Sequence, residues 1–103
     1  MRYTFQSNFS AIILKRDAEN ENAAITLAEQ AVKGISVSSC TEIQDRFQLE
    51  GVYRVSVKSP NEASAYFAAA ENWKRSDFSK LHHAMRGDFK LIENSRDTVE
   101  REW

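Results

Sequence analysis

Residues 52–62 read VYRVSVKSPNE, and this stretch decides the fold. Apolar and polar side chains alternate over 52–58, which is the period of a β-strand with one buried face. Ser59 and Glu62 then have the spacing of a capping box, in which the serine binds the first helical turn and the glutamate reaches back. Pro60 falls at the first helical position, where its missing N–H is not needed. The stretch therefore predicts a strand that leads directly into a helix.

A second strand is expected before this one, with a hairpin turn at Glu50-Gly51. Its apolar residues are Ile35, Val37, Ile43, Phe47 and Leu49, interrupted by the polar run 38–41. Directly paired residues share a face of the sheet. A three-residue loop over 50–52 pairs Leu49 with Tyr53 and meets this condition, whereas a two-residue loop at Glu50-Gly51 does not. The sequence therefore predicts an odd-length hairpin loop around Gly51.

Two elements are expected before the hairpin. The odd positions from Tyr3 onward are mostly apolar and the even ones polar as far as Ser10, which predicts a strand that is either long or broken near Ser7-Asn8. Both faces become apolar near Leu14, as in a central strand. A helix is expected after Asn20, which is a suitable N-cap, and it ends at Lys33 and Gly34.

Two helical segments and a last strand are expected after Ser59. The first segment has apolar residues at helical spacing: Ala63, Tyr66, Phe67, Ala70 and Trp73. The second starts near Ser76-Asp77, ends at Gly87, and places on one face Phe78, Leu81, His82 and Met85. Phe89 and Leu91 indicate a strand, and the remaining residues are polar and charged apart from Val99 and Trp103, one helical turn apart.

The expected order of elements is β-α-β-β-α-α-β, which indicates an α+β fold. With right-handed crossovers this order favours a split βαβ arrangement, an antiparallel four-stranded sheet with the helices packed on one face. It resembles the ferredoxin-like fold in element order. The other sheet face is then free, and on it lie Thr4, Gln6, Arg54, Ser56 and Lys58. We expect one α+β domain over 1–93 and a polar C-terminal tail over 94–103.

Composition excludes several classes of protein. The 103 residues have room for one core, and the net charge of −1 favours neither nucleic acid nor a membrane surface. Cys40 is the only cysteine, so no intramolecular disulfide forms. The N-terminal residues lack the apolar core of a signal peptide, and the longest apolar run, 11–14, is too short to span a membrane. A cytoplasmic location with a reduced thiol is expected.

Residue types that carry chemistry are few. His82 and His83 are adjacent, so on a helix they point about 100° apart and do not chelate one metal. We expect a packed His82, a surface His83 and a structural thiol at Cys40, which has no histidine near it in sequence. Each of the three glycines is used by a helix end or a turn, so no phosphate-binding loop is present. The sequence predicts no catalytic residues, no metal and no cofactor.

Positive charge gathers between Trp73 and Lys90, and aromatic residues interleave with it, as in proteins that stack on single-stranded nucleic acid. The strand 52–58 lacks an aromatic residue on its Arg54 face, where RNA-recognition domains stack bases. Nucleic-acid binding is therefore a weak alternative.

The favoured function is a non-enzymatic protein-interaction domain, an inhibitor or adaptor that docks on a larger complex. Anti-CRISPR-type proteins, which are compact inhibitors that come from phages and mobile elements, are an analogy in size only. The expected partner-binding residues are Arg54, Lys58, Lys74, Arg75, Lys80, Arg86 and Trp103. Trp103 either anchors a partner or second copy, or folds back on the domain's own core.

A dimeric ferredoxin-like enzyme of the monooxygenase type is the alternative among enzymes. Such enzymes use Trp, His and Asn in a cavity between the sheet and the helices. The corresponding candidates in this chain are Trp73, His82, His83 and Asn8. A homodimer is compatible with either function.

Overall fold

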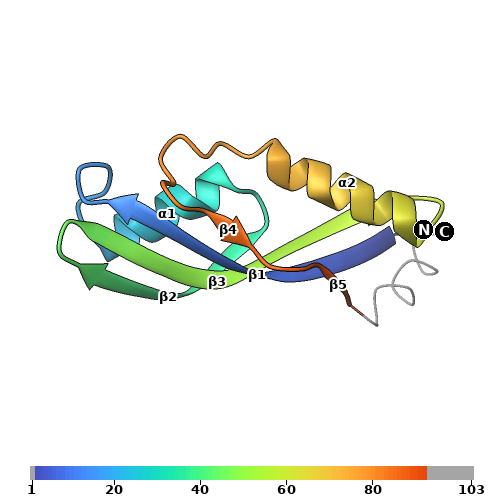
Figure 1. Cartoon of the computed structure of the whole chain (residues 1–103), viewed down its shortest axis with the longest axis horizontal. Helices are drawn as coiled ribbons and strands as arrows, with labels where there is room; N and C mark the ends of the chain where they lie inside the picture. The colour runs from blue at the N-terminus through green and yellow to red at the C-terminus, as the bar shows by residue number, and fades with distance from the viewer. Residues whose placement is uncertain (1, 93–103) are drawn as a thin grey trace.

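The computed structural model describes residues 2–92. Its elements are, in order, β1 (Arg2–Leu14), α1 (Glu21–Ala31), β2 (Ile35–Ile43), β3 (Arg46–Lys58), α2 (Glu62–Lys74), β4 (Met85–Arg86) and β5 (Lys90–Leu91). The strands form one antiparallel sheet in the order β2-β3-β1-β4, and β5 also pairs with β1. Both helices lie over the same face of this sheet (Figure 1). The α+β class is confirmed, with two short strands, β4 and β5, in place of one last strand.

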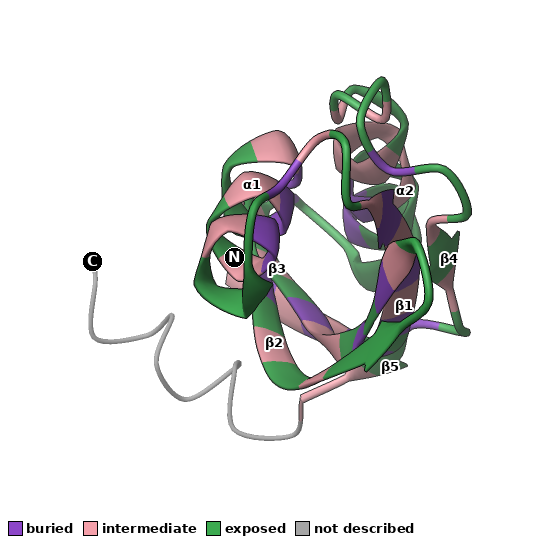
Figure 2. Cartoon of the chain, turned by 90° about the vertical axis from the view of Figure 1, so that its left-hand side faces the viewer, coloured by how far each residue is buried: buried purple, intermediate pink, exposed green. Residues whose placement is uncertain are grey.

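Strand β1 confirms the alternation in its sequence. It runs unbroken for 13 residues and pairs with β3 along its whole length, from Arg2↔Lys58 to Leu14↔Arg46. The odd-numbered residues of β1 are all buried beneath the helices, whereas the even-numbered ones face the other side of the sheet. In Figure 2 the buried parts of both helices face the sheet as well. One hydrophobic core therefore lies between the helices and the sheet.

The predicted hairpin turn at Gly51 was wrong. The turn lies at Gln44 and Asp45, where Gln44 has a φ of +50°, as tight two-residue hairpin turns require. Phe47 and Leu49 consequently belong to β3, and Gly51 lies in the middle of that strand. The pairing of β2 with β3 shifts at a β-bulge between Val37 and Ser39, opposite Gly51.

The start of α2 also differs from the prediction. Asn61 is the N-cap, with an extended backbone, and its Oδ1 accepts a hydrogen bond from the amide of Ser64 at 2.8 Å. Ser59 instead donates its hydroxyl to the carbonyl oxygen of Asn61, and Pro60 precedes the helix. Asparagine and serine are equally good N-caps. The cap nearer the helix is used here, so α2 begins at Glu62, two residues later than expected.

The second helical segment predicted over 76–87 was wrong. Its backbone groups bond to other elements: the amide of Asp77 to the carbonyl oxygen of Ala31, and that of His82 to Ile12. Asp77 also accepts a hydrogen bond from the amide of Ser79 at 3.0 Å, which closes a local turn. These bonds replace the bonds of a helix, so residues 75–84 form an irregular connection that leads to β4.

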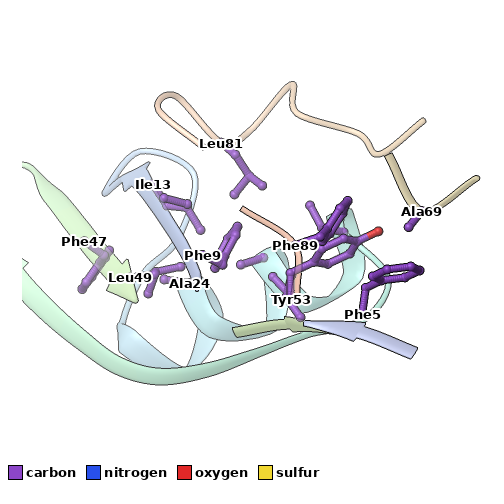
Figure 3. Packing of buried hydrophobic residues seen from close by; sticks show 14 of the residues in the cluster. Phe5, Phe9, Ile13, Ala24, Phe47, Leu49, Tyr53, Ala69, Leu81 and Phe89 are labelled. Atoms are coloured by element: carbon purple, nitrogen blue, oxygen red, sulfur yellow. The ribbon is translucent and has the colours of Figure 1, made fainter. Parts of the chain in front are cut away.

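The centre of the core is aromatic. Tyr53 is fully buried, and its ring lies 5.2 Å from that of Trp73 and 5.8 Å from that of Phe89. Phe5 and Ala69 lie next to Tyr53 and Phe89, between β1 and α2 (Figure 3). The hydroxyl of Tyr53 accepts a hydrogen bond from Nδ2 of Asn72 at 2.6 Å, which satisfies the polar atom of the buried ring. This cluster fixes how α2 sits on the sheet.

Candidate functional site

The outward side of α2 carries the most exposed aromatic residue in the described part of the chain. Phe67 is 71% exposed and its neighbour Tyr66 44% exposed. Ala63 and Ala70 lie one helical turn before and after Phe67 on the same side, because residues three and four apart share a helix face. We refer to Ala63, Tyr66, Phe67 and Ala70 as the α2 patch.

The inner side of α2 explains why the patch points outward. Ala65 and Ala69 are fully buried against the sheet, and their small side chains let the helix approach it closely. At about 100° per residue, Phe67 points away from both of them. Asn72 fixes the rotation of the helix because its amide binds the hydroxyl of the buried Tyr53. Turning Phe67 inward would break this contact and insert a large ring where only alanine fits.

Tyr66 joins the patch to the core. Its ring makes edge-on contacts with Phe5, at 5.8 Å between ring centroids, and with Phe89, at 5.5 Å. Such geometry suits aromatic pairs and stabilises both rings. Tyr66 therefore connects the patch with the core residues Phe5 and Phe89.

The predicted partner-binding residues lie in separate places. Arg54 and Lys58 are exposed on the sheet face opposite the helices, as expected, and Arg54 donates to Oε1 of Gln6 at 2.7 Å. Thr4 and Ser56 share a hydroxyl hydrogen bond of 2.8 Å on the same face. This outer face is thus polar and internally hydrogen-bonded.

The other basic residues lie elsewhere. Lys74 and Arg75 are at the C-terminal end of α2, where Lys74 pairs with Glu71 at 3.7 Å. Lys80 binds Asp17 at 3.4 Å, and the guanidinium of Arg86 lies 3.9 Å above the ring of Phe89. Trp103 lies outside the described residues. The structure therefore does not join the predicted residues into one basic surface.

Three of the four residues considered for an enzyme come together. Trp73, His82 and His83 line one open hollow of about 360 Å³ at the end of α2. Asn8 lies on the outer face of β1 and lines a different hollow, of about 510 Å³, with Ser10 and Glu50 among its other residues. The hollow that Trp73 lines therefore contains the tryptophan and the histidines of the expected set but lacks the asparagine.

The carboxylate of Asp17 contacts two residues of the 75–84 connection, His82 and Lys80. Oδ2 of Asp17 lies 3.5 Å from Nε2 of His82, and its Oδ1 lies 3.4 Å from Nζ of Lys80. Desolvation raises the pKa of Asp17, but hydrogen bonds from His82 and Lys80 and the charge of Arg16 outweigh it and hold that pKa below its ordinary value. Asp17 therefore fastens the 75–84 connection to the loop after β1.

Replacing Asp17 with asparagine is expected to destabilise the protein at pH 7 and to destabilise it less at pH 3. A lowered carboxyl pKa contributes stability that is fully present above the unfolded-state pKa, and this contribution is lost as the pH falls through the lower folded-state pKa. Urea unfolding of both proteins at the two pH values measures the difference. A deficit of equal size at pH 7 and pH 3 would contradict the charge-based contact of Asp17 with Lys80.

Other kinds of site find little support within residues 2–92. No group of three His, Cys, Asp or Glu side chains there could hold a metal ion. Burial raises the pKa of the Cys40 thiol, and the carboxylates of Glu21 and Glu42 raise it further, which keeps the thiol protonated at neutral pH. No helix in this part of the chain is long and apolar enough to cross a membrane.

Comparisons with protein-family models, with curated proteins and with solved structures found no match for this chain. The candidate site therefore rests on its geometry. The sequence analysis grouped Tyr66 and Phe67 with the other apolar residues at helical spacing and did not single them out as an exposed surface, so it missed the α2 patch. A usable signal was present, because Ala65, Ala69 and Asn72 form a second stripe of small and polar residues at helical spacing.

Proposed function

We propose that this chain is a small non-enzymatic protein-interaction domain that docks on a larger partner through the α2 patch, as an inhibitor or an adaptor. The observation that carries the proposal is the 71% exposure of Phe67 on a helix whose rotation is fixed from inside. Aromatic residues, phenylalanine among them, are enriched in the cores of protein interfaces.

The surroundings of Phe67 suit such a contact. Ala63 and Ala70 have short side chains, so a partner can approach the helix backbone on both sides of the ring. Polar residues border the patch at Ser64 and Lys74, which gives the apolar centre and polar rim of an interface. A helix anchored to the core also loses little conformational entropy on binding.

The proposal includes a finer assignment of the fold as ferredoxin-like. The antiparallel order β2-β3-β1-β4, with one helix after β1 and one after β3, supports a split βαβ arrangement. In this arrangement the sheet is the support that presents α2 to a partner. The fold alone says nothing about which partner is bound.

Two observations favour this function over the alternatives. The first alternative is a dimeric enzyme. A dimer that stacks its two sheets needs an apolar surface on the sheet face opposite the helices, whereas β1 and β3 present hydrogen-bonded pairs there, such as Gln6 with Arg54. A nucleic-acid surface needs available positive charge, whereas Lys74 and Lys80 are paired with carboxylates and Arg86 lies over a ring. Neither alternative has an observation as direct as the exposure of Phe67.

A pair of matched variants tests the proposed function. Phe67→Glu places a charge in the patch, and Ala68→Glu places the same charge on an exposed neighbouring position outside it. Both variants and the wild type are used for affinity capture from cells that encode the chain, with quantitative mass spectrometry. We expect a partner that wild type and Ala68→Glu retain and Phe67→Glu loses by at least about tenfold. Equal capture by all three proteins would refute the α2 patch as the binding site.

A further inference from the structure

We propose that the end of β3 is a second docking surface, which binds an extended acidic segment of a partner protein as an additional strand of the sheet. The surface is the free edge of residues 54–58, which we call the β3 edge. It is separate from the α2 patch, so the inference goes beyond the proposed function. Three features of the β3 edge carry it: unpaired backbone groups, two partly exposed valines and two basic side chains.

The β3 edge has a strand on one side only. β2 pairs with β3 only as far as Ile35, which lies opposite Tyr53. β1 continues along β3 to the last residue of that strand, Lys58. In Figure 1, β2 runs beneath α1, whereas the part of the sheet beneath α2 has β1 and β5 as the companions of β3. Among the described residues, no strand therefore occupies the place beside 54–58 where β2 would continue.

The backbone groups of the β3 edge point into this open place. The amide of Arg54 donates to the carbonyl oxygen of Gly34 at 2.9 Å, so it points away from β1. Alternate residues of a strand direct their backbone groups to the same side, so Ser56 and Lys58 point the same way as Arg54. Neither Ser56 nor Lys58 has a backbone partner on this side within residues 2–92. Such groups are a template for a further strand, and an extended peptide pairs with them through its main chain.

The side chains of the β3 edge alternate between the two faces of the sheet. Val55 and Val57 lie on the face beneath the helices, where they pack against the core and remain partly exposed. Arg54, Ser56 and Lys58 are exposed on the opposite face. Directly paired residues share a face. An added strand therefore fits best with apolar residues opposite the valines and with acidic residues opposite Arg54 and Lys58.

The two basic side chains select the occupant. Arg54 donates to the neutral amide oxygen of Gln6, and neither Arg54 nor Lys58 forms an ion pair with a described residue. A second copy of the chain fits poorly. Antiparallel pairing of two β3 edges about Ser56 places Arg54 opposite Lys58 twice, and like charges that are directly opposite destabilise a sheet. A segment with glutamate or aspartate at these two positions gains an attractive pair at each.

A symmetric peptide is the probe for this surface. Its sequence is Glu-Val-Ser-Val-Glu, with a fluorescent label and an amidated end, and it places a glutamate opposite Arg54 and Lys58 in either direction. The reference peptide, Lys-Val-Ser-Val-Lys, has the same length and the same valines. Fluorescence anisotropy is expected to show at least about tenfold tighter binding of the glutamate peptide, because two directly opposed pairs change from repulsive to attractive.

Matched variants of the chain locate the binding. Ser56→Pro removes the amide at the centre of the β3 edge, a position at which an edge strand accepts proline. Ser56→Ala retains that amide, and both variants lose the hydroxyl hydrogen bond to Thr4. We expect Ser56→Ala to bind the glutamate peptide like the wild type, and Ser56→Pro to bind it at least about tenfold more weakly.

A charge reversal provides a test that does not depend on the folding of the proline variant. Arg54→Glu/Lys58→Glu exchanges the two exposed basic side chains for acidic ones. This variant is expected to prefer the lysine peptide, by the same reasoning that makes the wild type prefer the glutamate peptide. An unchanged preference for the glutamate peptide would overturn the inference.

Two further results would overturn the inference. They are equal binding of both peptides by the wild type, or no binding of the glutamate peptide up to about 1 mM, and undiminished binding by a folded Ser56→Pro. Phe67→Glu is expected to bind the peptide like the wild type, because the α2 patch is a separate surface. Peptide binding at the β3 edge together with unchanged partner capture by Phe67→Glu would keep this inference and reject the proposed function.

Discussion

Replacing Gly51 with alanine is expected to destabilise the protein by about 3 kcal/mol, as an overpacked interior does. An added Cβ would overlap the carbonyl oxygen of Ser36 and press on the backbone of Val37. The obstacle is the backbone of β2, which cannot move aside as a flexible side chain can. Gly51 also pairs with Phe9 of β1, so β3 is held on both sides and has no direction in which to shift.

Gly87→Ala is the matched control for this prediction. A Cβ at Gly87 would lie 3.5 Å from Oγ of Ser7, an ordinary contact, so its effect is expected to stay within about 0.5 kcal/mol or to be slightly stabilising. Urea unfolding monitored by circular dichroism gives both values. Similar stabilities of the two variants would show that β2 can give way at Ser36, and would contradict the tight approach at the bulge.

The same glycine shows where sequence reasoning reached its limit. A Glu-Gly pair between two apolar runs is typical of a turn, and the face parity of Leu49 and Tyr53 fits a turn as well as a continuous strand. Gly51 instead lies inside β3, opposite a bulge in β2 between Val37 and Ser39. The bulge is a property of the pairing of two strands, so neither strand reveals it alone.

Helix α2 illustrates a second limit. Its existence follows from local spacing, whereas the side that it buries depends on the sheet. Two stripes compete: a large aromatic one through Phe67 and a small one through Ala65 and Ala69. Hydrophobicity favours the first, but close packing over Tyr53 favours the second. The exposed stripe is the candidate site, and a conflict between local pattern and structure is typical of functional surfaces.

Elements that depend on local signals were predicted well. Strand β1 follows its period of two from end to end, and Asn20 caps α1 through the amide of Ala23 at 2.9 Å. The helix predicted from Ser76-Asp77 onward was wrong for the opposite reason, because this segment depends on distant contacts. Its apolar residues have helical spacing, yet its backbone is bonded to Ala31 of α1 and Ile12 of β1. Local spacing carries no information about such distant partners.

Replacing Tyr53 with alanine is expected to cost about 4 kcal/mol, the range for removal of a large aromatic side chain from a core. The ring is fully buried and touches Trp73 and Phe89, so its loss leaves a cavity lined by groups from α2 and from the segment before β5. The hydrogen bond from Asn72 is lost as well. Guanidinium unfolding measures the cost, and a value below about 1 kcal/mol would show that the ring does not hold the core together.

Tyr53→Phe separates the hydroxyl from the ring. It keeps the ring contacts but leaves the amide of Asn72 without its acceptor, at an expected cost of about 1–2 kcal/mol. Asn72→Ala should remove the same hydrogen bond, so the double variant is expected to cost less than the sum of the two single ones. Strict additivity would mean that the hydroxyl and the amide do not interact. In that case the rotation of α2 would depend on the packing of Ala65 and Ala69 and on the ring contacts of Tyr66 and Trp73, without a hydrogen bond.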